Sequence, residues 1–258
     1  RVGGRAIRDA QVLSHVPLQR ADLGLVPGGR VEALEAVNVL ARLPGAGPEA
    51  RETVVISAHY DHIGIKEAAA PPEAGVELDL VYNGADDDAS GCAAVLELAR
   101  AFAAGPPPGR TLVFLFATGE EIGLLGTRHY LRHPSEPLEV TVANLNLEML
   151  GRPDELAGGP GKLWLTGDER SNLGAAWREL GLEIAPDPRP DQSFFQRSDN
   201  YAFAFLGIVA QSLSSYDLHG DYHGVDDEAV AVLQRGPQQG DGGLGVDVAG
   251  RRPAHRRP

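Results

Sequence analysis

The sequence predicts an α/β fold with a mostly parallel central sheet that helices cover on both faces. Short runs such as residues 53–58 (TVVISA) and 111–117 (TLVFLFA) are mainly apolar, which is typical of strands buried on both faces. Along the chain these runs alternate with segments whose apolar residues recur at helical spacing. Alternating strands and helices favour a parallel sheet.

The first part of the chain begins irregularly and then enters the sheet. Residues 1–30 contain paired glycines and show no clean period, so we expect an irregular segment. Residues 31–43 alternate in part between apolar and polar until Pro44-Gly45, which predicts an edge strand. Residues 53–58 are predicted to form a buried strand, and residues 63–82, with Pro71-Pro72, a long loop.

The middle of the chain contains the strongest helix and strand patterns. Residues 89–104 are rich in Ala and Leu at helical spacing and are followed by three prolines, which predicts a helix that ends there. Residues 111–117 follow as a second buried strand. Residues 121–132 have a helical pattern, and residues 140–147 that of a strand.

The last part of the chain carries shorter elements. We expect a strand at residues 162–166, a helix at 170–180, a strand at 208–213 and a final helix from 226 to 234. Residues 236–258 differ from the rest, because Gly, Pro and Arg dominate and no apolar period remains. This tail is predicted to be disordered.

Composition limits the class of protein. The 258 residues suit one large α/β domain or two small ones. The formal charge of -13 argues against a nucleic-acid binder, whose signature is a basic face. The single cysteine, Cys92, excludes an internal disulfide and fits a small core residue. No apolar run is long enough for a transmembrane helix, and no signal peptide is visible. Because the chain begins at Arg1, we expect upstream sequence to be missing.

Metal-binding side chains follow three of the predicted strands. His59 and Asp61 come after the first buried strand, Glu120 and Glu121 after the second, and Glu148 after the strand at 140–147. Ligands of open parallel sheets bind at the carboxyl ends of the strands. Solubility alone does not explain this convergence, so we expect a site at that edge.

The individual motifs favour metal-assisted hydrolysis. Asp61 is placed to orient His59, as a carboxylate beside a metal-bound imidazole does, although a surface His beside an acid is an equal reading. Asp86-Asp87-Asp88 precedes a helix; one Asp suffices for a cap, and three would repel one another without a cation. Of Glu120-Glu121, one can bind a metal while the other takes a proton from water.

Tyr222-His223 lies in a Gly-flanked turn after the last strand. His223 is a possible metal ligand, and the Tyr222 hydroxyl could donate to a developing oxyanion. By itself this pair is a weak signal.

Six segments together resemble the M28 peptidases, which are co-catalytic zinc aminopeptidases and carboxypeptidases. The segments occur in the family's order between about residues 31 and 235: AHYDH (58–62), GADDDASG (84–91), ATGEEIGLLGT (117–127), NLEMLGR (146–152), RSDNYAF (197–203) and DYHGVDD (221–227). The resemblance implies the fold of the zinc-dependent exopeptidases. It divides the chain into an irregular, truncated segment (1–30), a catalytic domain (31–235) and a disordered or aberrant tail (236–258).

The resemblance also implies roles for individual residues. Asp87, the middle residue of the Asp triplet, would bridge two Zn²⁺ ions. The ions would be bound by five residues in all: His59, Asp87, Glu121, Glu148 and His223. His59 and Glu148 would each ligate one metal, and Glu121 the metal that does not bind Glu148. His223 would join either Glu121 or Glu148. Glu120 matches the general base, Tyr222 the oxyanion donor and Asp61 the acid that orients His59.

These roles imply hydrolysis of peptides or small proteins, with an aminopeptidase preferred. A carboxypeptidase, a single-zinc glutaminyl cyclase, a non-catalytic binding module and a damaged fragment are the alternatives. The family's usual fourth ligand is Asp, and here it is Glu148.

The resemblance favours a secreted or periplasmic location. The other histidines are interpreted as spare: His62, His129, His133, His219 and His255. Ser198-Asp199 is interpreted as a pocket or structural element and Met149 as core.

Overall fold

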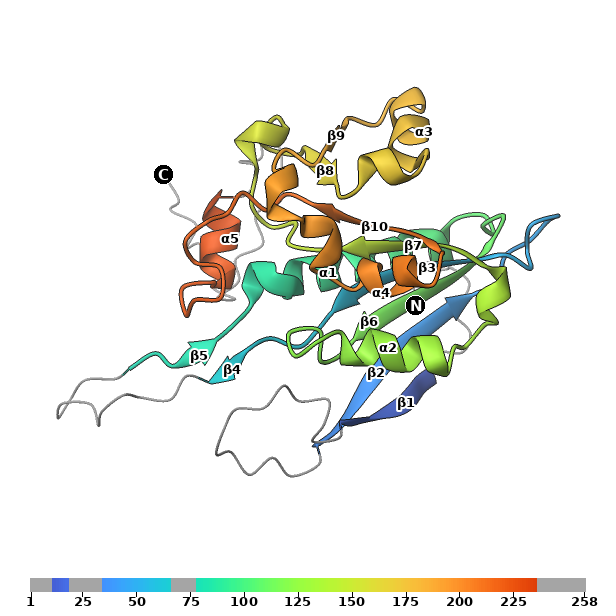
Figure 1. Cartoon of the computed structure of the whole chain (residues 1–258), viewed down its shortest axis with the longest axis horizontal. Helices are drawn as coiled ribbons and strands as arrows, with labels where there is room; N and C mark the ends of the chain where they lie inside the picture. The colour runs from blue at the N-terminus through green and yellow to red at the C-terminus, as the bar shows by residue number, and fades with distance from the viewer. Residues whose placement is uncertain (1–10, 19–33, 66–77, 236–258) are drawn as a thin grey trace, which may run out of the picture.

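An eight-stranded mixed sheet forms the centre of the computed structural model, which describes residues 11–18, 34–65 and 78–235 (Figure 1). The strand order is β1-β2-β6-β3-β7-β10-β8-β9, and the four inner strands β6, β3, β7 and β10 run parallel. The strands are β1 (Gln11–Leu18), β2 (Leu34–Leu43), β3 (Thr53–His59), β6 (Thr111–Ala117), β7 (Thr141–Leu147), β8 (Leu163–Leu165), β9 (Ile184–Pro186) and β10 (Val209–Ser214). A separate two-stranded sheet pairs β4 (Gly64–Ile65) with β5 (Val81–Tyr82).

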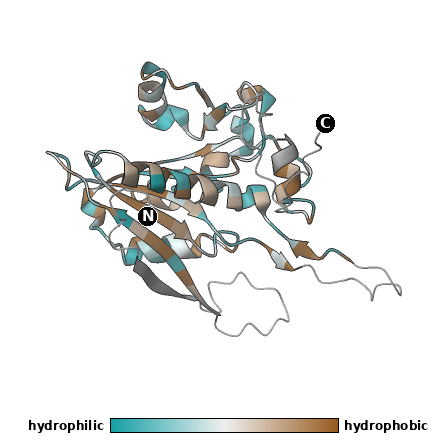
Figure 2. Cartoon of the chain, turned by 180° about the vertical axis from the view of Figure 1, so that it is seen from behind, coloured by the Kyte–Doolittle hydropathy of each residue, from teal (hydrophilic) through white to brown (hydrophobic). Residues whose placement is uncertain are grey.

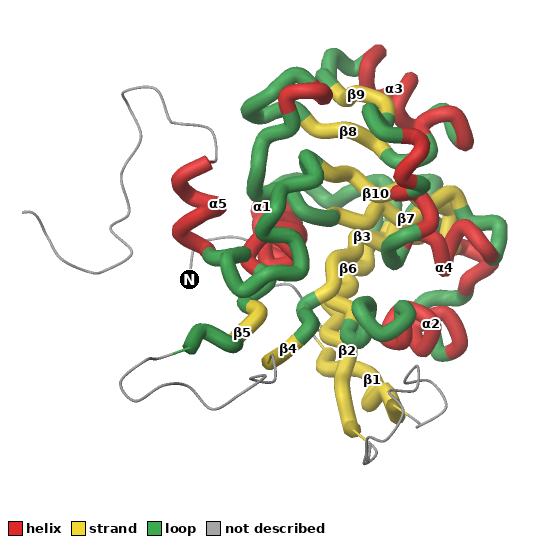
Figure 3. The backbone as a smooth tube through the Cα atoms, turned by 60° about the vertical axis from the view of Figure 1, so that its left-hand side comes forward, coloured by secondary structure: helices red, strands yellow, loops and turns green. Residues whose placement is uncertain are grey.

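Helices cover both faces of this sheet, as the sequence predicts. They are α1 (Gly91–Ala104), α2 (Leu125–Arg132), α3 (Leu173–Glu179), α4 (Asn200–Phe205) and α5 (Ala229–Arg235). Figure 3 shows α1 on one side of the central strands and α2 and α4 on the other. None of the described helices is long and apolar enough to cross a membrane.

The core is divided by the sheet into two layers. Val55 of β3 points to the side where Tyr130 of α2 and Phe203 of α4 pack. The next residue, Ile56, points to the side of Val95 on α1. Because side chains alternate along a strand, an apolar run fills both layers at once. Seen from behind, the central strands are largely hydrophobic, while α1 in front carries both kinds of residue (Figure 2).

The structure differs from the sequence prediction mainly at the ends of the sheet. Residues 11–18, in the segment predicted to be irregular, form β1 and pair antiparallel with β2. The prediction that residues 31–43 form an edge strand is therefore wrong, because β2 lies between β1 and β6. The predicted loop 63–82 contains β4 and β5, and β9 and α4 were not predicted.

One helix begins later than its pattern indicated. Residues 121–124 form a turn, and α2 starts at Leu125, after Leu124 adopts a left-handed conformation with φ 58°. The turn gives Glu120 and Glu121 their positions beyond β6. The predicted tail, residues 236–258, lies outside the described residues, and the domain bounds stay predictions.

Asn38 of β2 connects the sheet to this turn. It is fully buried; its Oδ1 accepts from the Thr118 amide at 3.2 Å, and its Nδ2 donates to the Gly126 carbonyl at 2.8 Å. Replacement of Asn38 by Ala leaves both backbone groups buried without this partner. We expect the free energy of unfolding to fall by about 1–3 kcal/mol in urea denaturation. The exposed Asn83→Ala is the control, with a change within about 0.5 kcal/mol; equal effects would contradict the prediction.

Candidate metal centre

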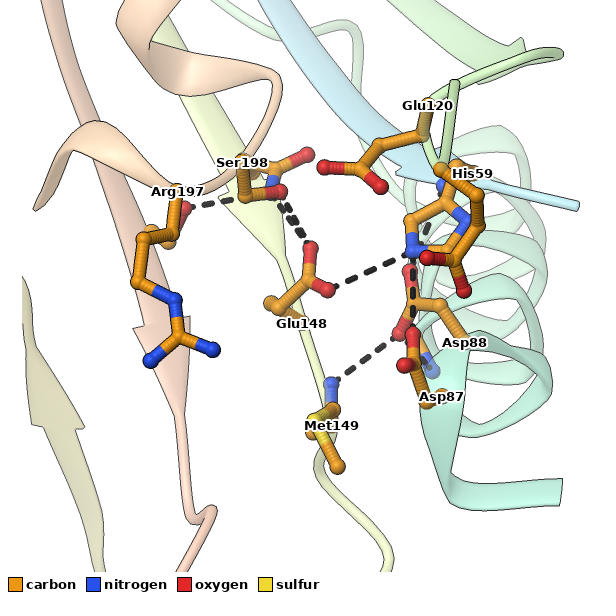
Figure 4. A network of polar contacts seen from close by, with 12 residues as sticks. His59, Asp87, Asp88, Glu120, Glu148, Met149, Arg197 and Ser198 are labelled. Atoms are coloured by element: carbon orange, nitrogen blue, oxygen red, sulfur yellow. Dashed lines mark hydrogen bonds and ion pairs between the residues drawn. The ribbon is translucent and has the colours of Figure 1, made fainter. Parts of the chain in front are cut away.

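The predicted site residues meet at the carboxyl edge of the parallel strands. His59 ends β3, Glu120 and Glu121 follow β6, and Glu148 follows β7. Asp87 lies in the turn before α1, and the loop after β10 brings in His223. In Figure 4 the side chains of His59, Asp87 and Glu148 point toward one another, with Glu120 beside them.

One group of donors surrounds the first oxygen of Asp87. His59 Nε2 lies 3.1 Å from Asp87 Oδ1 and 3.3 Å from Glu148 Oε1. One ligand atom from each of the three residues lies within 4.8 Å of the others. His59 and Asp87 are buried.

A second group surrounds the other oxygen of Asp87. His223 Nε2 lies 3.2 Å from both Asp87 Oδ2 and Glu121 Oε2. The sequence left open whether His223 lies with Glu121 or with Glu148. The structure places it with Glu121. His59 and Glu148 lie on the same side of Asp87, opposite Glu121. His62, interpreted from the sequence as a spare residue, also reaches this group, with Nδ1 2.7 Å from Glu121 Oε1.

Asp61 contacts both His59 and the Glu120-Glu121 turn, but its carboxylate does not orient His59 as the sequence predicted. His59 Nδ1 is 3.0 Å from the backbone carbonyl of Asp61 and 3.7 Å from its carboxylate. The carboxylate instead accepts from the amides of Glu120 at 3.1 Å and Glu121 at 3.4 Å. The carbonyl fixes the imidazole, and the carboxylate fixes the Glu120-Glu121 turn.

The three consecutive aspartates have three different environments. Only Asp87 faces the donor groups. Asp88 accepts from the amides of His59, Gly91 and Met149 at 3.0–3.2 Å. Asp86 accepts from the Gly151 amide at 2.7 Å. Asp86 and Asp88 thus have protein partners, and the expected need for a cation stays a prediction for Asp87 alone.

Burial and charge shift the pKa values of the central groups. Burial raises the pKa of Glu120 to about 10, and Glu148 adds to this effect while His59 opposes it. For His59, burial lowers the pKa, but Glu148, Asp61 and Asp87 together raise it well above its usual value. For Asp87, burial raises the pKa, yet His223 and His59 hold it well below its usual value. Without a cation, Glu120 and His59 therefore favour their protonated forms, whereas Asp87 favours the carboxylate.

Two residues that orient Glu148 were missed as site residues. Ser198 Oγ donates to Glu148 Oε2, and Asn146 Nδ2 donates to the same oxygen at 3.0 Å. Asn146 also donates to Ser198 Oγ at 2.8 Å, so the three side chains form one network. The RSDN segment was the available signal, and it was interpreted only as a pocket or structural element. Met149 is buried in an aromatic cluster, as predicted.

Tyr222 lies beside the centre and lines a cavity with Glu148. Its wall also contains three aromatic residues, Trp164, Phe194 and Tyr216, with Arg197 over the Phe194 ring at 5.0 Å, as well as Thr166 and three serines. Burial raises the pKa of Tyr222, which keeps its hydroxyl protonated. The hydroxyl can therefore act as a hydrogen-bond donor next to the metal-binding residues.

The donor set fits two divalent cations. Imidazole nitrogens and carboxylate oxygens are the ligands that zinc and related metals take in proteins. His62 Nδ1 and Glu121 Oε1 are both buried without a hydrogen bond and lie 2.7 Å apart, as two ligand atoms of one cation could. The two oxygens of Asp87 face different donor groups, as a bridging ligand requires.

Comparison with known proteins places the chain among peptidases. The model of peptidase family M28 matches residues 38–239. A vacuolar membrane protease of Lachancea thermotolerans is 29% identical over 80% of this chain and 19% of its own length. A probable lipoprotein aminopeptidase of Mycobacterium tuberculosis is 32% identical over 55% of this chain and 31% of its own. The chain thus spans less than a third of either relative.

Solved structures share the fold. A zinc aminopeptidase from Bacillus subtilis superposes with a TM-score of 0.58 at 22% identity, covering 79% of this chain and 49% of that one. A glutaminyl cyclase of Porphyromonas gingivalis gives 0.54 at 21% identity, covering 79% and 75%. The architecture is therefore that of the zinc-dependent exopeptidase fold, within which both kinds of enzyme occur.

Proposed function

Because this chain belongs to peptidase family M28, we propose that it is an exopeptidase with two zinc ions that removes residues from the amino end of peptides. One observation carries the proposal. Two groups of His and carboxylate donors lie on the two oxygens of Asp87, and Glu120 stands beside them as a carboxyl group that neither group uses. The likeness to zinc aminopeptidases supports the choice of metal and of substrate end.

Five residues would hold the metals. His59 and Glu148 would bind one ion, Glu121 and His223 the other, and Asp87 both. Zinc bound there would lower the pKa of a coordinated water and would polarise a substrate carbonyl.

Glu120 would move the proton. Its burial favours the protonated form in the bare protein, but nearby cations favour the carboxylate. As a carboxylate it takes a proton from the attacking water and passes it to the leaving amine. Asp61 holds Glu120 in place through the backbone amide. The protonated Tyr222 hydroxyl donates to the negative charge that develops on the carbonyl oxygen.

The choice of the amino end rests on the likeness to zinc aminopeptidases, since bound zinc would offset the charge of the carboxylates at the centre. An acetylated amino terminus lacks the free amino group that an aminopeptidase requires.

A second candidate, removal of carboxy-terminal residues, is favoured by Arg197. Arg197 lines the same cavity as Glu148, and its guanidinium lies 3.5 Å from the Tyr222 hydroxyl. Among the ion pairs formed by the described residues, none includes Arg197. The terminal carboxylate of a substrate could form an ion pair with the Arg197 guanidinium.

A panel of substrates tests the two candidates. We expect leucine and alanine p-nitroanilides to be cleaved and their N-acetyl forms to resist. A zinc chelator should abolish cleavage and added Zn²⁺ restore it. Cleavage confined to N-blocked peptides with a free carboxyl end, lost in Arg197→Met, would establish the second candidate. Conversion of amino-terminal glutamine to its cyclic form, with one zinc per chain, would overturn both.

A further inference from the structure

His62 is a buried imidazole whose position the five predicted ligands do not explain. Its side chain is only 8% exposed, and both ring nitrogens lack a hydrogen-bond partner. Nδ1 lies 2.7 Å from Glu121 Oε1 and 3.9 Å from Asp87 Oδ2. Glu121 Oε1 is likewise buried without a hydrogen bond. The two atoms face each other as an ion pair without making a hydrogen bond, and a cation that binds both would compensate their burial.

The ring is held in place by the backbone of the opposite segment. Gly84 has φ 63°, and a Cβ added there would lie 2.6 Å from Cγ of His62. The absence of a side chain at Gly84 is what allows the imidazole to lie against the turn that carries Asp87. His62 also packs edge-on against the His223 ring, with centroids 5.7 Å apart. Two imidazoles therefore flank the same pair of carboxylates.

The two sides of Asp87 offer different numbers of donors. His62, Asp87 and Glu121 each offer a ligand atom within 4.8 Å of the others, and His223 contacts both carboxylates at 3.2 Å. The Glu121 side thus has four protein donors. The opposite side has three, from His59, Asp87 and Glu148. Zinc sites closed by four protein ligands are typically structural, whereas three ligands leave a position open for water or substrate.

We propose that His62 is a fourth protein ligand of the metal on the Glu121 side, which closes that site and leaves the His59 side as the open one. The proposal rests on the proposed metal-binding function, and it assigns different tasks to the two ions. The Glu121-side ion is held more tightly and organises Asp87 and His223. An ion held by His59, Asp87 and Glu148 would keep a coordination position open for water or substrate.

Metal binding tests this assignment without any activity measurement. Apo protein would be titrated with Zn²⁺ against a competing chelator, and then with Co²⁺, whose visible absorption reports coordination number and ligand type. In His62→Ala we expect one of the two Zn²⁺ affinities to fall by more than about 100-fold. This exceeds the usual effect of a residue that only hydrogen-bonds to a metal ligand. The Co²⁺ spectrum of the tighter site should change as well. His133→Ala, an exposed histidine, is the matched control and should change neither.

The possible outcomes separate the proposal from the function on which it rests. Unchanged affinity in His62→Ala overturns the proposal. A weaker affinity with an unchanged Co²⁺ spectrum also overturns it, because His62 would then only position Glu121. If the wild type binds a single ion whose spectrum depends on His62, the ligand assignment stands and the two-zinc function fails. Should the Ala variant not fold, as judged by circular dichroism, His62→Gln provides the same comparison.

Discussion

Glu120→Gln is expected to lower kcat/KM by about 100- to 10,000-fold while both metals remain bound. General base catalysis contributes an effect of this size, and the amide of Gln cannot take a proton from water. Gln keeps the shape of the side chain and the backbone contact with Asp61. Because burial already favours the neutral form of Glu120, the neutral amide should also leave stability intact. The measurements are steady-state hydrolysis and zinc content per chain.

The neighbouring residue provides the contrast for this variant. Glu121 approaches His62 and His223 and is predicted to bind metal, so Glu121→Gln should lose zinc as well as activity. Glu97→Gln, on the exposed side of α1, should change neither. Near wild-type activity in Glu120→Gln would remove the base from the mechanism. Loss of zinc in that variant would instead identify Glu120 as a ligand.

Arg152→Met is expected to lower the free energy of unfolding by about 3–5 kcal/mol, the cost of leaving buried carboxylates without their cation. The Arg152 side chain is 1% exposed and donates to Asp227 at 3.1 Å and to Asp221. Its Nε lies 3.8 Å from Asp86. Met has a similar length but no charge, so the fully buried Asp227 would lose its counter-ion, and the fully buried Asp86 would keep only His219, whose Nε2 lies 3.1 Å from its Oδ2.

The same variant should loosen the metal centre, because this network joins its separate parts. Asp227 accepts from the amides of Asp86 and Asp87 at 3.0–3.1 Å, and Asp221 lies two residues before His223. Chemical denaturation at a fixed zinc concentration measures the stability.

Arg110→Met is the control for this measurement. Arg110 pairs with Glu52 at the surface, with both side chains more than 40% exposed, so its loss should cost only about 0–1 kcal/mol. Equal losses in the two variants would contradict a structural role for Arg152.

Most of the central sheet was predictable from local patterns. Strand β6 has the predicted bounds, and β3 extends by a single residue, because a buried parallel strand must be apolar on both faces. The strands and helices that were missed are of another kind. β9 and α4 are short and β1 lies in a stretch without a clear period, so they depend on neighbours that are distant in sequence. The position of β2 inside the sheet is likewise decided by β1, not by its own residues.

The sequence by itself brought together four of the side chains at the candidate metal centre, and the family resemblance added His223. His59, Glu121 and Glu148 follow strong strands, Asp87 precedes a strong helix, and the carboxyl ends of parallel strands share one edge. What only the tertiary structure decided is how they divide. His223 lies with Glu121, the Asp61 carboxylate holds the Glu120 turn, Ser198 supports Glu148, and His62 enters the group. The physical reason is that these contacts join loops with no periodic pattern, and their positions are fixed by long-range packing and by buried charges such as Arg152.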